Sequence, residues 1–176
     1  VFQLVDMHGV IDGAYAQVFG FSARKNVEVQ IDRTGEDCWV SGDVHLLERA
    51  VTNILYNAVQ HTPEGNSVEI RLYTKQGVHV AVTDTGSGIA SELIPYLFEP
   101  YFRAKKKLHE KSLHNESFNN PPIENTQRTT QGAKSYGLGL SFVHTVVQRH
   151  GGNIHVDSEL GKSTSFTLTF PMASAD

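Results

Sequence analysis

The feature that most constrains the fold of this chain is a regular alternation of apolar and polar residues in three separate stretches. The sequence reads VEIRLY at residues 68–73, VHVAV at residues 78–82 and SFTLTF at residues 165–170. Neighbouring side chains of a β-strand point to opposite faces of the sheet, so each stretch should place one face on a core and the other in water. The pattern therefore predicts a sheet that is covered on one side only.

Helical patterns supply the layer that would cover this sheet. Apolar residues recur at helical spacing at residues 10–21, 44–61 and 138–147. A further strand pattern occupies residues 27–31, and Trp39–Val40 is expected to be its short partner strand. We therefore predict an α+β fold: a two-layer α/β sandwich with a mixed five-stranded sheet, three helices on one face and solvent on the other.

Length, charge and cysteine content restrict the class of protein. The chain has 176 residues, its net charge is −4, and Cys38 is its single cysteine. The size suits one domain, the charge gives no basic surface for nucleic acid, and one cysteine favours a reducing compartment. No apolar run approaches the roughly 20 residues that span a bilayer. Because the sequence starts at Val1 in mid-pattern and without methionine, we expect a fragment of a longer protein, with an anchor or sensor upstream.

One long polar segment interrupts these patterns. Residues 104–134 are rich in Lys, His, Asn, Gln and Thr and carry no apolar periodicity. Loops of this length inside a compact domain are generally lids, binding loops or disordered insertions. The segment ends directly before a glycine-rich helix start, so we favour a mobile lid over a surface insertion.

Two asparagines lie in the second helical pattern. Asn53 and Asn57 are four residues apart, so they share a helix face beside the apolar stripe. A polar helix edge would explain one asparagine, whereas a pair at this spacing favours a lined site. Carboxamide oxygens are hard ligands of the type that Mg²⁺ accepts together with phosphate oxygens and water.

A second candidate feature ends the strand pattern that starts at residue 78. Asp84 begins the sequence DTGSG, in which Gly86 and Gly88 permit positive φ angles and close approach of a ligand. A carboxylate at the end of a buried strand can accept a hydrogen bond from an exocyclic amine, such as that of adenine. A plain Asp-Gly turn is the alternative interpretation.

The third candidate feature is the pair Gly137 and Gly139 at the start of the last helical pattern. Glycine costs roughly 1 kcal/mol relative to alanine in a helix. A helix N-terminus, however, presents free N–H groups and the positive end of the helix dipole, which favour anions. Glycines would let a phosphate reach this backbone, although they also serve tight packing in other proteins.

Five motifs in a fixed order resemble those of the catalytic, ATP-binding domain of sensor histidine kinases. NILYNA, DTGSGI, LFEPYFR, GLGLSFV and GKST are similar to its N, G1, F, G2 and G3 boxes, and the resemblance covers nearly the whole chain. The wider superfamily has the Bergerat ATP-binding fold, shared with type II topoisomerases, a heat-shock chaperone and mismatch-repair ATPases. The resemblance implies ATP and Mg²⁺ as cofactors, and one catalytic domain over residues 1–176 with its ATP lid at residues 104–134.

The resemblance also implies roles for individual residues. Asn53 would hold Mg²⁺ through its side-chain oxygen and Arg103 would reach the γ-phosphate, which makes these two the catalytic candidates. Asp84 would accept from the adenine amino group, and Thr164 would support the adenine pocket unless GKST is only a hairpin turn. For Phe98 and Phe102, the proposed lid anchors, core packing is the alternative. The remaining nucleotide-binding candidates would contact the phosphates or shape the pocket: Asn57, His61, Gly86, Gly88, Ile89, Lys105, Gly137, Leu138, Gly139 and Leu140.

Two departures from the superfamily bear on the reaction. ATPases of this fold carry a water-activating glutamate four residues before the first N-box asparagine, where this chain has Arg49. Glu48 is adjacent, but a shift of one residue turns it roughly 100° around the helix. The chain also lacks the His-Glu motif of a phosphoacceptor helix, because the HEK at His109 lies in the expected lid. We therefore expect a kinase whose acceptor histidine lies on a domain absent from this chain.

The sequence thus predicts the catalytic domain of a bacterial-type sensor histidine kinase in two-component signal transduction. It would transfer the γ-phosphoryl group of Mg·ATP to a histidine on a separate dimerisation and phosphotransfer domain of a homodimeric protein. The other expected partner is a response regulator, with no nucleic acid, and the expected location is the cytoplasmic side of an inner-membrane sensor protein. The alternatives are an anti-sigma type serine kinase, an ATP-gated conformational ATPase module, and a docking domain that has lost nucleotide binding.

Overall fold

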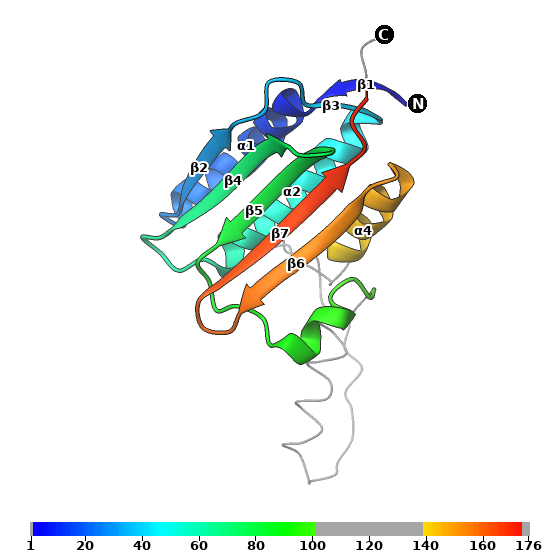
Figure 1. Ribbon diagram of the computed structural model, residues 1–176. Helices are drawn as coiled ribbons and strands as arrows, with labels where there is room; N and C mark the ends of the chain where they lie inside the picture. Colours follow the sequence, from blue (N-terminus) through cyan, green and yellow to red (C-terminus); the bar gives the residue numbers. More distant parts are fainter. Residues whose placement is uncertain (1, 101–138, 174–176) are drawn as a thin grey trace, which may run out of the picture.

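The computed structural model describes residues 2–100 and 139–173, and a five-stranded sheet forms their centre (Figure 1). The strand order is β2-β4-β5-β7-β6. β2 pairs with β4 in parallel and all other neighbours pair antiparallel, so the sheet is mixed, as predicted. The strands are Glu28–Arg33 (β2), Ser67–Thr74 (β4), Val78–Asp84 (β5), Asn153–Glu159 (β6) and Ser163–Phe170 (β7).

Helices α1 (Met7–Arg24), α2 (Val44–His61) and α4 (Gly139–Arg149) cover one face of this sheet (Figure 1). The opposite face carries no helix in the described parts of the chain. Asp6 starts α1 by accepting a hydrogen bond from the N–H of His8 at 2.9 Å, and Asp43 caps α2 in the same way. Such caps satisfy N–H groups that have no partner within the helix. The predicted two-layer α+β fold is confirmed.

The core lies between the helices and the sheet. Val68, Ile70 and Leu72 of β4 are fully buried, whereas Glu69 and Arg71 between them are exposed on the open face. The buried residues of α2 are Leu47, Ala50, Val51, Ile54, Leu55, Ala58 and Val59. Removing this apolar surface from water on both layers holds the helices to the sheet.

The fifth strand differs from the one that the sequence predicted. The Trp39–Val40 segment belongs to β3 (Trp39–Gly42), which pairs antiparallel with β1 (Gln3–Asp6) in a separate two-stranded sheet rather than with β2. The main sheet is completed by β6, whose Ile154 and Val156 face the core but are only half-buried. Because β6 is an edge strand, its apolar pattern is shorter and weaker than that of the central strands.

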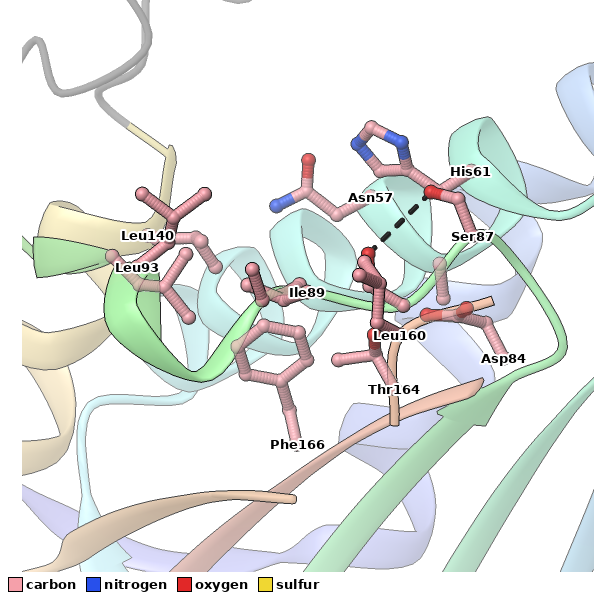
Figure 2. Close-up of a pocket in the computed structure, with 14 residues that line it drawn as sticks. Asn57, His61, Asp84, Ser87, Ile89, Leu93, Leu140, Leu160, Thr164 and Phe166 are labelled. Carbon is pink, nitrogen blue, oxygen red and sulfur yellow. Dashed lines mark hydrogen bonds between the residues drawn. The ribbon is translucent and has the colours of Figure 1, made fainter. Parts of the chain in front are cut away.

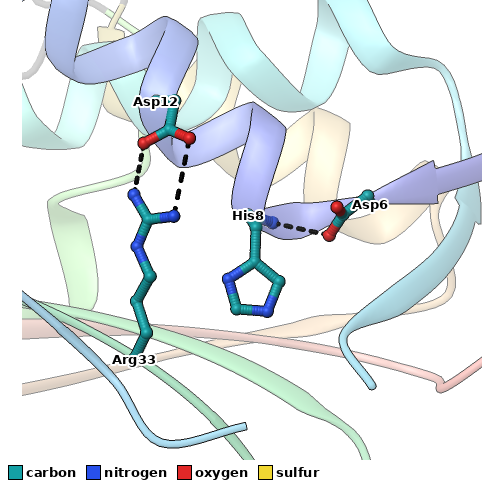
Figure 3. A network of polar contacts seen from close by, with 4 residues as sticks. All are labelled: Asp6, His8, Asp12 and Arg33. Carbon is teal, nitrogen blue, oxygen red and sulfur yellow. Dashed lines mark hydrogen bonds and ion pairs between the residues drawn. The ribbon is translucent and has the colours of Figure 1, made fainter. Parts of the chain in front are cut away.

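A polar contact holds α1 against the other edge of the sheet (Figure 3). The guanidinium of Arg33 on β2 forms a two-pronged ion pair with the carboxylate of Asp12 on α1. Both side chains are partly exposed, so this pair contributes about 1 kcal/mol at most. The packing of α1 therefore depends mainly on its buried apolar face.

Two further expectations from the sequence concern the lid and membrane-spanning segments. The expected lid at residues 104–134 lies outside the described residues. Among the helices that the structure describes, none is both long and apolar enough to cross a bilayer.

Candidate functional site

A pocket of about 380 Å³ opens between α2 and the ends of β5 and β7 (Figure 2). The 3-10 helix η1 (Ser91–Tyr96), the first turn of α4 and the turn between β6 and β7 complete its walls. Pockets for cofactors and small ligands are typically about 300–1,000 Å³ and mostly apolar with a few polar groups. The lining residues are Asn57, Ala58, His61, Asp84, Ser87, Gly88, Ile89, Ala90, Leu93, Leu97, Leu140, Leu160, Thr164 and Phe166.

Asp84 is the buried carboxylate of this pocket. Its residue is 4% exposed, and its Oδ1 accepts a hydrogen bond from the N–H of Gly86 at 2.8 Å. Burial raises the pKa of Asp84, and backbone hydrogen bonds from Gly86 and Thr164 act against that rise. A buried carboxylate is costly unless its oxygens are paired, so Asp84 is suited to accept from a ligand donor in the pocket.

The loop that follows Asp84 is held closely on both sides. Gly88 has a φ angle of +65°, and a Cβ atom there would lie 2.1 Å from the carbonyl oxygen of Glu159. A Cβ atom on Gly86 would lie 2.5 Å from the carbonyl oxygen of His61, at the end of α2. Both glycines therefore allow the loop to pass between α2 and the β6–β7 turn, and no larger residue would fit without moving backbone.

Hydroxyl groups join the β6–β7 turn to the same loop. Ser158 Oγ accepts from the N–H of Ile89 at 2.8 Å and donates to the carbonyl oxygen of Ser163 at 2.8 Å. It also lies 2.8 Å from the hydroxyl oxygen of Thr164, which lines the pocket. The N–H of Gly161 donates to the carbonyl oxygen of Ser87 at 2.7 Å. These bonds fix the wall that contains Asp84 and Thr164.

The N-box asparagines occupy different positions relative to the pocket. Asn57 lines it, together with His61 one turn further along α2 (Figure 2). Asn53 lies one turn before Asn57 on the same helix and is half-buried, but it does not line the pocket. The two asparagines therefore lie on the same side of α2, and only Asn57 reaches the pocket.

Arg49 and Glu48 point to different neighbours of α2. The guanidinium of Arg49 lies over the ring of Phe142 on α4, 4.5 Å from its centroid. Glu48 accepts a hydrogen bond from the side chain of Gln17 on α1. Neither the Glu48 carboxylate nor the Arg49 guanidinium lines the pocket.

Apolar side chains form the rest of the wall. Leu140 of α4 is buried, whereas Leu160, at the tip of the β6–β7 turn, is 67% exposed and stands at the rim. A flat, largely apolar ring with one hydrogen-bond donor would match this wall and the carboxylate of Asp84. Four apolar lining residues were not predicted as site residues: Leu93, Leu97, Leu160 and Phe166. Leu97 begins the LFEPYFR motif and Phe166 is an inward residue of the strand pattern, whereas Leu93 and Leu160 had no signal in the sequence.

The structure brings together many, but not all, of the predicted site residues. Those that line the pocket are Asn57, His61, Asp84, Gly88, Ile89, Leu140 and Thr164. Gly86 lies directly behind it, and Gly139 is the first described residue of α4. Phe98 is half-buried against the core, and its ring stacks on that of His144 with centroids 5.3 Å apart. The remaining candidates lie outside the described residues: Phe102, Arg103, Lys105, Gly137 and Leu138.

Protein groups alone do not form a metal site in the described part of the chain. No group of three or more His, Cys, Asp or Glu side chains there could hold an ion.

Comparison with known families gives one match that covers most of the chain. Residues 42–174 match the family model described as histidine kinase-, DNA gyrase B-, and HSP90-like ATPase. The match begins at the end of β3 and includes every residue that lines the pocket.

Curated relatives with similar sequences carry kinase names. The chain is 29% identical over 150 residues to the adaptive-response sensory kinase SasA of Gloeothece citriformis, covering 84% of this chain and 32% of that protein. It is 29% identical over 173 residues to the sensor histidine kinase ZraS of Escherichia coli, covering 97% of this chain and 31% of that protein. The chain therefore spans about a third of the length of these relatives.

Solved structures with the same fold include histidine kinases. The mycobacterial sensor histidine kinase MprB matches with a TM-score of 0.70 and 29% identity, covering 98% of this chain and 100% of that chain. The catalytic domain of histidine kinase ThkA matches with a TM-score of 0.73 and 21% identity, covering 98% and 96%. ThkA in complex with the response regulator TrrA also matches, with a TM-score of 0.69 and 20% identity, covering 98% and 42%.

Proposed function

Because this chain belongs to the family of histidine kinase-, DNA gyrase B- and HSP90-like ATPases, we propose that it is the ATP-binding catalytic domain of a sensor histidine kinase. In this proposal it binds Mg·ATP and presents the γ-phosphoryl group to a histidine on a separate dimerisation and phosphotransfer domain. The names of the curated relatives support a sensor histidine kinase over the serine-kinase and ATP-gated alternatives.

The observation that carries the proposal is the buried carboxylate of Asp84 in an apolar pocket. A purine ring would lie between the apolar side chains, and its exocyclic amine would donate to Asp84. The pocket of about 380 Å³ is large enough for a nucleoside. The residues present therefore fit the base of ATP.

The same pocket offers polar groups for the phosphates. Asn57 and His61 line it from α2, and Gly139 begins α4, whose N-terminal N–H groups favour anions. We assign the magnesium ligand to the side-chain oxygen of Asn53, one helical turn before Asn57. Arg103 and Lys105 complete the proposed phosphate contacts but lie outside the described residues.

Phosphoryl transfer requires mainly positioning and charge stabilisation, which ATP-bound metal and cationic groups supply. The role of this chain is to orient the triphosphate and to keep water from becoming the acceptor. Arg49 occupies the position at which related ATPases carry a water-activating glutamate, and its guanidinium is held against Phe142. This replacement supports a kinase that conserves ATP for its protein acceptor.

The wider setting is also part of the proposal. The chain spans about a third of its curated relatives, so we place the dimerisation and phosphoacceptor domain elsewhere in the full protein. A response regulator is the proposed final acceptor; ThkA, which has the same fold, forms a complex with the response regulator TrrA. We place the domain on the cytoplasmic side of an inner-membrane sensor.

Phosphotransfer with a supplied acceptor tests this function. The chain is incubated with γ-labelled ATP and magnesium, with and without the phosphoacceptor domain of its own full-length protein. We expect label on the acceptor domain that is lost in acid and kept in base, as for phosphohistidine. Acid-stable label would instead indicate serine or threonine, and rapid release of phosphate without acceptor would indicate an ATPase.

A further inference from the structure

Ser158 lies at the centre of a small hydrogen-bond network behind the pocket wall. Its hydroxyl oxygen is 2.8 Å from each of three groups: the N–H of Ile89, the carbonyl oxygen of Ser163 and the hydroxyl oxygen of Thr164. The network connects the loop after Asp84 with both strands of the β6–β7 hairpin. Among the described residues, no buried polar side-chain atom is left without a partner.

Counting protons gives this network one consistent arrangement. A serine hydroxyl has one proton and two acceptor sites. The carbonyl oxygen of Ser163 can only accept, so the proton of Ser158 is used there. The N–H of Ile89 can only donate, so it occupies one acceptor site of Ser158. The contact with Thr164 is then a hydrogen bond only if the Thr164 hydroxyl donates to Ser158.

The direction of this bond decides what Thr164 offers to a ligand. In this arrangement the single proton of Thr164 is used on Ser158, so its hydroxyl oxygen can offer a ligand only acceptor sites. Asp84, its direct partner across β5 and β7, is also an acceptor when ionised (Figure 2). Two neighbouring oxygens of the wall therefore accept and neither donates.

We propose that Ser158 is a positioning residue that holds the Thr164 hydroxyl in its acceptor orientation and so makes the pocket select a base edge with an amino group over one with a carbonyl. This inference rests on the proposed binding of ATP. At position 6, an amino purine carries two N–H donors for these acceptors, whereas a 6-oxo purine carries an oxygen there, which the acceptors leave without a donor and repel, and keeps N1–H as the one donor of that edge. Ser158 does not line the pocket, so it acts through Thr164.

The test compares ATP with ITP, which replaces the amino group at purine C6 by a carbonyl. Affinities for both nucleotides are measured by calorimetry for the wild type and for Ser158→Ala. In the variant, the Thr164 hydroxyl is free to rotate and to donate into the pocket. We expect the ratio of ATP to ITP affinity to fall by about five-fold, the size of one ordinary hydrogen bond.

Three further variants separate this role from a structural one. Ser165→Ala removes a hydroxyl from a comparable pair, Ser165 Oγ with Thr83 Oγ1 at 2.9 Å, on the open face of the same sheet, and should leave the ratio unchanged. Ser158→Thr keeps the hydroxyl and should keep the ratio. In a Thr164→Val background, Ser158→Ala should no longer change the ratio, because the hydroxyl that it orients is gone.

The outcomes are distinguishable. A purely structural role, such as loosening of the loop at Ile89, would weaken ATP and ITP binding equally and leave the ratio at its wild-type value, which would overturn the inference. The inference would also be overturned if Ser158→Ala changed the ratio of ATP to ITP affinity equally in the wild-type and in the Thr164→Val background. If the wild type binds neither nucleotide, the proposed function itself is wrong, and that result precedes any comparison of variants.

Discussion

Asp84 and Thr164 lie directly opposite each other on the antiparallel strands β5 and β7, at the point where both reach the pocket. Asp84 ends its strand and Thr164 is the second residue of its own, so the two residues lie side by side at the same end of the sheet. This pairing places a carboxylate and a hydroxyl from positions 80 residues apart in the chain on the same wall.

The first prediction concerns the charge at this wall. We expect Asp84→Asn to lower ATP affinity by about 2–3 kcal/mol, the scale of a hydrogen bond to a charged group that is left unmade. The amide that replaces the carboxylate places a donor against the amino group of the base. Calorimetry with ATP and GTP checks this, and equal affinity of the wild type for the two nucleotides would exclude the assignment of Asp84 to the adenine.

The second prediction concerns pH. Burial raises the pKa of Asp84 above its ordinary value of 3.8. The folded, ligand-free protein therefore binds this proton more tightly than the unfolded chain does, and the stability that this contributes is present below the unfolded pKa and lost as pH rises through the folded pKa. ATP binding needs the ionised form, so its affinity should fall on acidification at a higher pH than for an ordinary aspartate.

Nucleotide titrations at several pH values measure this effect. The ionisations of ATP itself are common to all variants, so the comparison is between the wild type and Asp84→Asn. Below the raised pKa, the wild-type affinity for ATP should fall by up to about ten-fold for each unit of pH. The variant should show no such additional fall. Parallel pH profiles for the two proteins would contradict a role for the Asp84 charge.

The sequence predicted the central part of the fold because that part follows simple periodicity. In β4 and β7 every second residue is buried, so the alternation around Ile70 and Leu168 was sufficient to place both strands. The alternation in β6 is shorter, because Ile154 and Val156 are only half-buried at the sheet edge. The Trp39–Val40 segment was given the wrong partner, because four-residue strands carry no information on pairing.

The site was predictable only where a motif marks it. Asp84 and the glycines after it form a motif that is visible in the sequence. The structure gives the reason for one of these glycines, because the close contact of Gly88 with the β6–β7 turn leaves no room for a side chain. Leu93 and Leu160 could not be predicted, since they lie in a short helix and in a turn without periodicity, whereas Leu97 begins the LFEPYFR motif but was not predicted as a site residue. Their place in the pocket depends on how distant segments pack, which no local pattern contains.

The third prediction uses one of these unexpected residues. Leu160 is 67% exposed at the pocket rim, on a turn fixed by the bond from Gly161 to Ser87. We expect the bound base to cover this side chain, so Leu160→Ala should weaken ATP and ADP binding by about five-fold, a part of the free energy of burying a leucine. Stability without ligand should change by about 0.5 kcal/mol or less, since the side chain is already in water.

Leu4→Ala is the matched control, because Leu4 is 41% exposed on β1 and does not line the pocket. It should leave both affinities unchanged. Unaltered binding by Leu160→Ala would place the base away from the β6–β7 turn.

The fourth prediction concerns the backbone of the loop. We expect Gly88→Ala to lower thermal stability and to abolish nucleotide binding, because the φ angle of +65° disfavours alanine and its Cβ would lie 2.1 Å from the carbonyl oxygen of Glu159. The backbone of the loop or of the turn must move, which displaces Ile89. Gly65→Ala is the control, since Gly65 also has a positive φ, +81°, but no atom within 4 Å of a Cβ. It should cost stability through φ alone and leave ATP affinity intact.

The last prediction separates metal binding from base binding. Asn53 lies one turn from the pocket-lining Asn57 and does not line the pocket itself, so Asn53→Ala should leave most of the affinity for the base. Alanine is a better helix former than asparagine, so α2 should remain folded. If Asn53 holds the magnesium, phosphotransfer to the supplied acceptor domain should fall by roughly 100-fold or more, since a metal ion stabilises the transferring charge by several kcal/mol. Gln60→Ala, which removes an exposed amide from the same helix, should transfer at the wild-type rate. Normal magnesium-dependent transfer by Asn53→Ala would show that this asparagine is only a structural residue of α2.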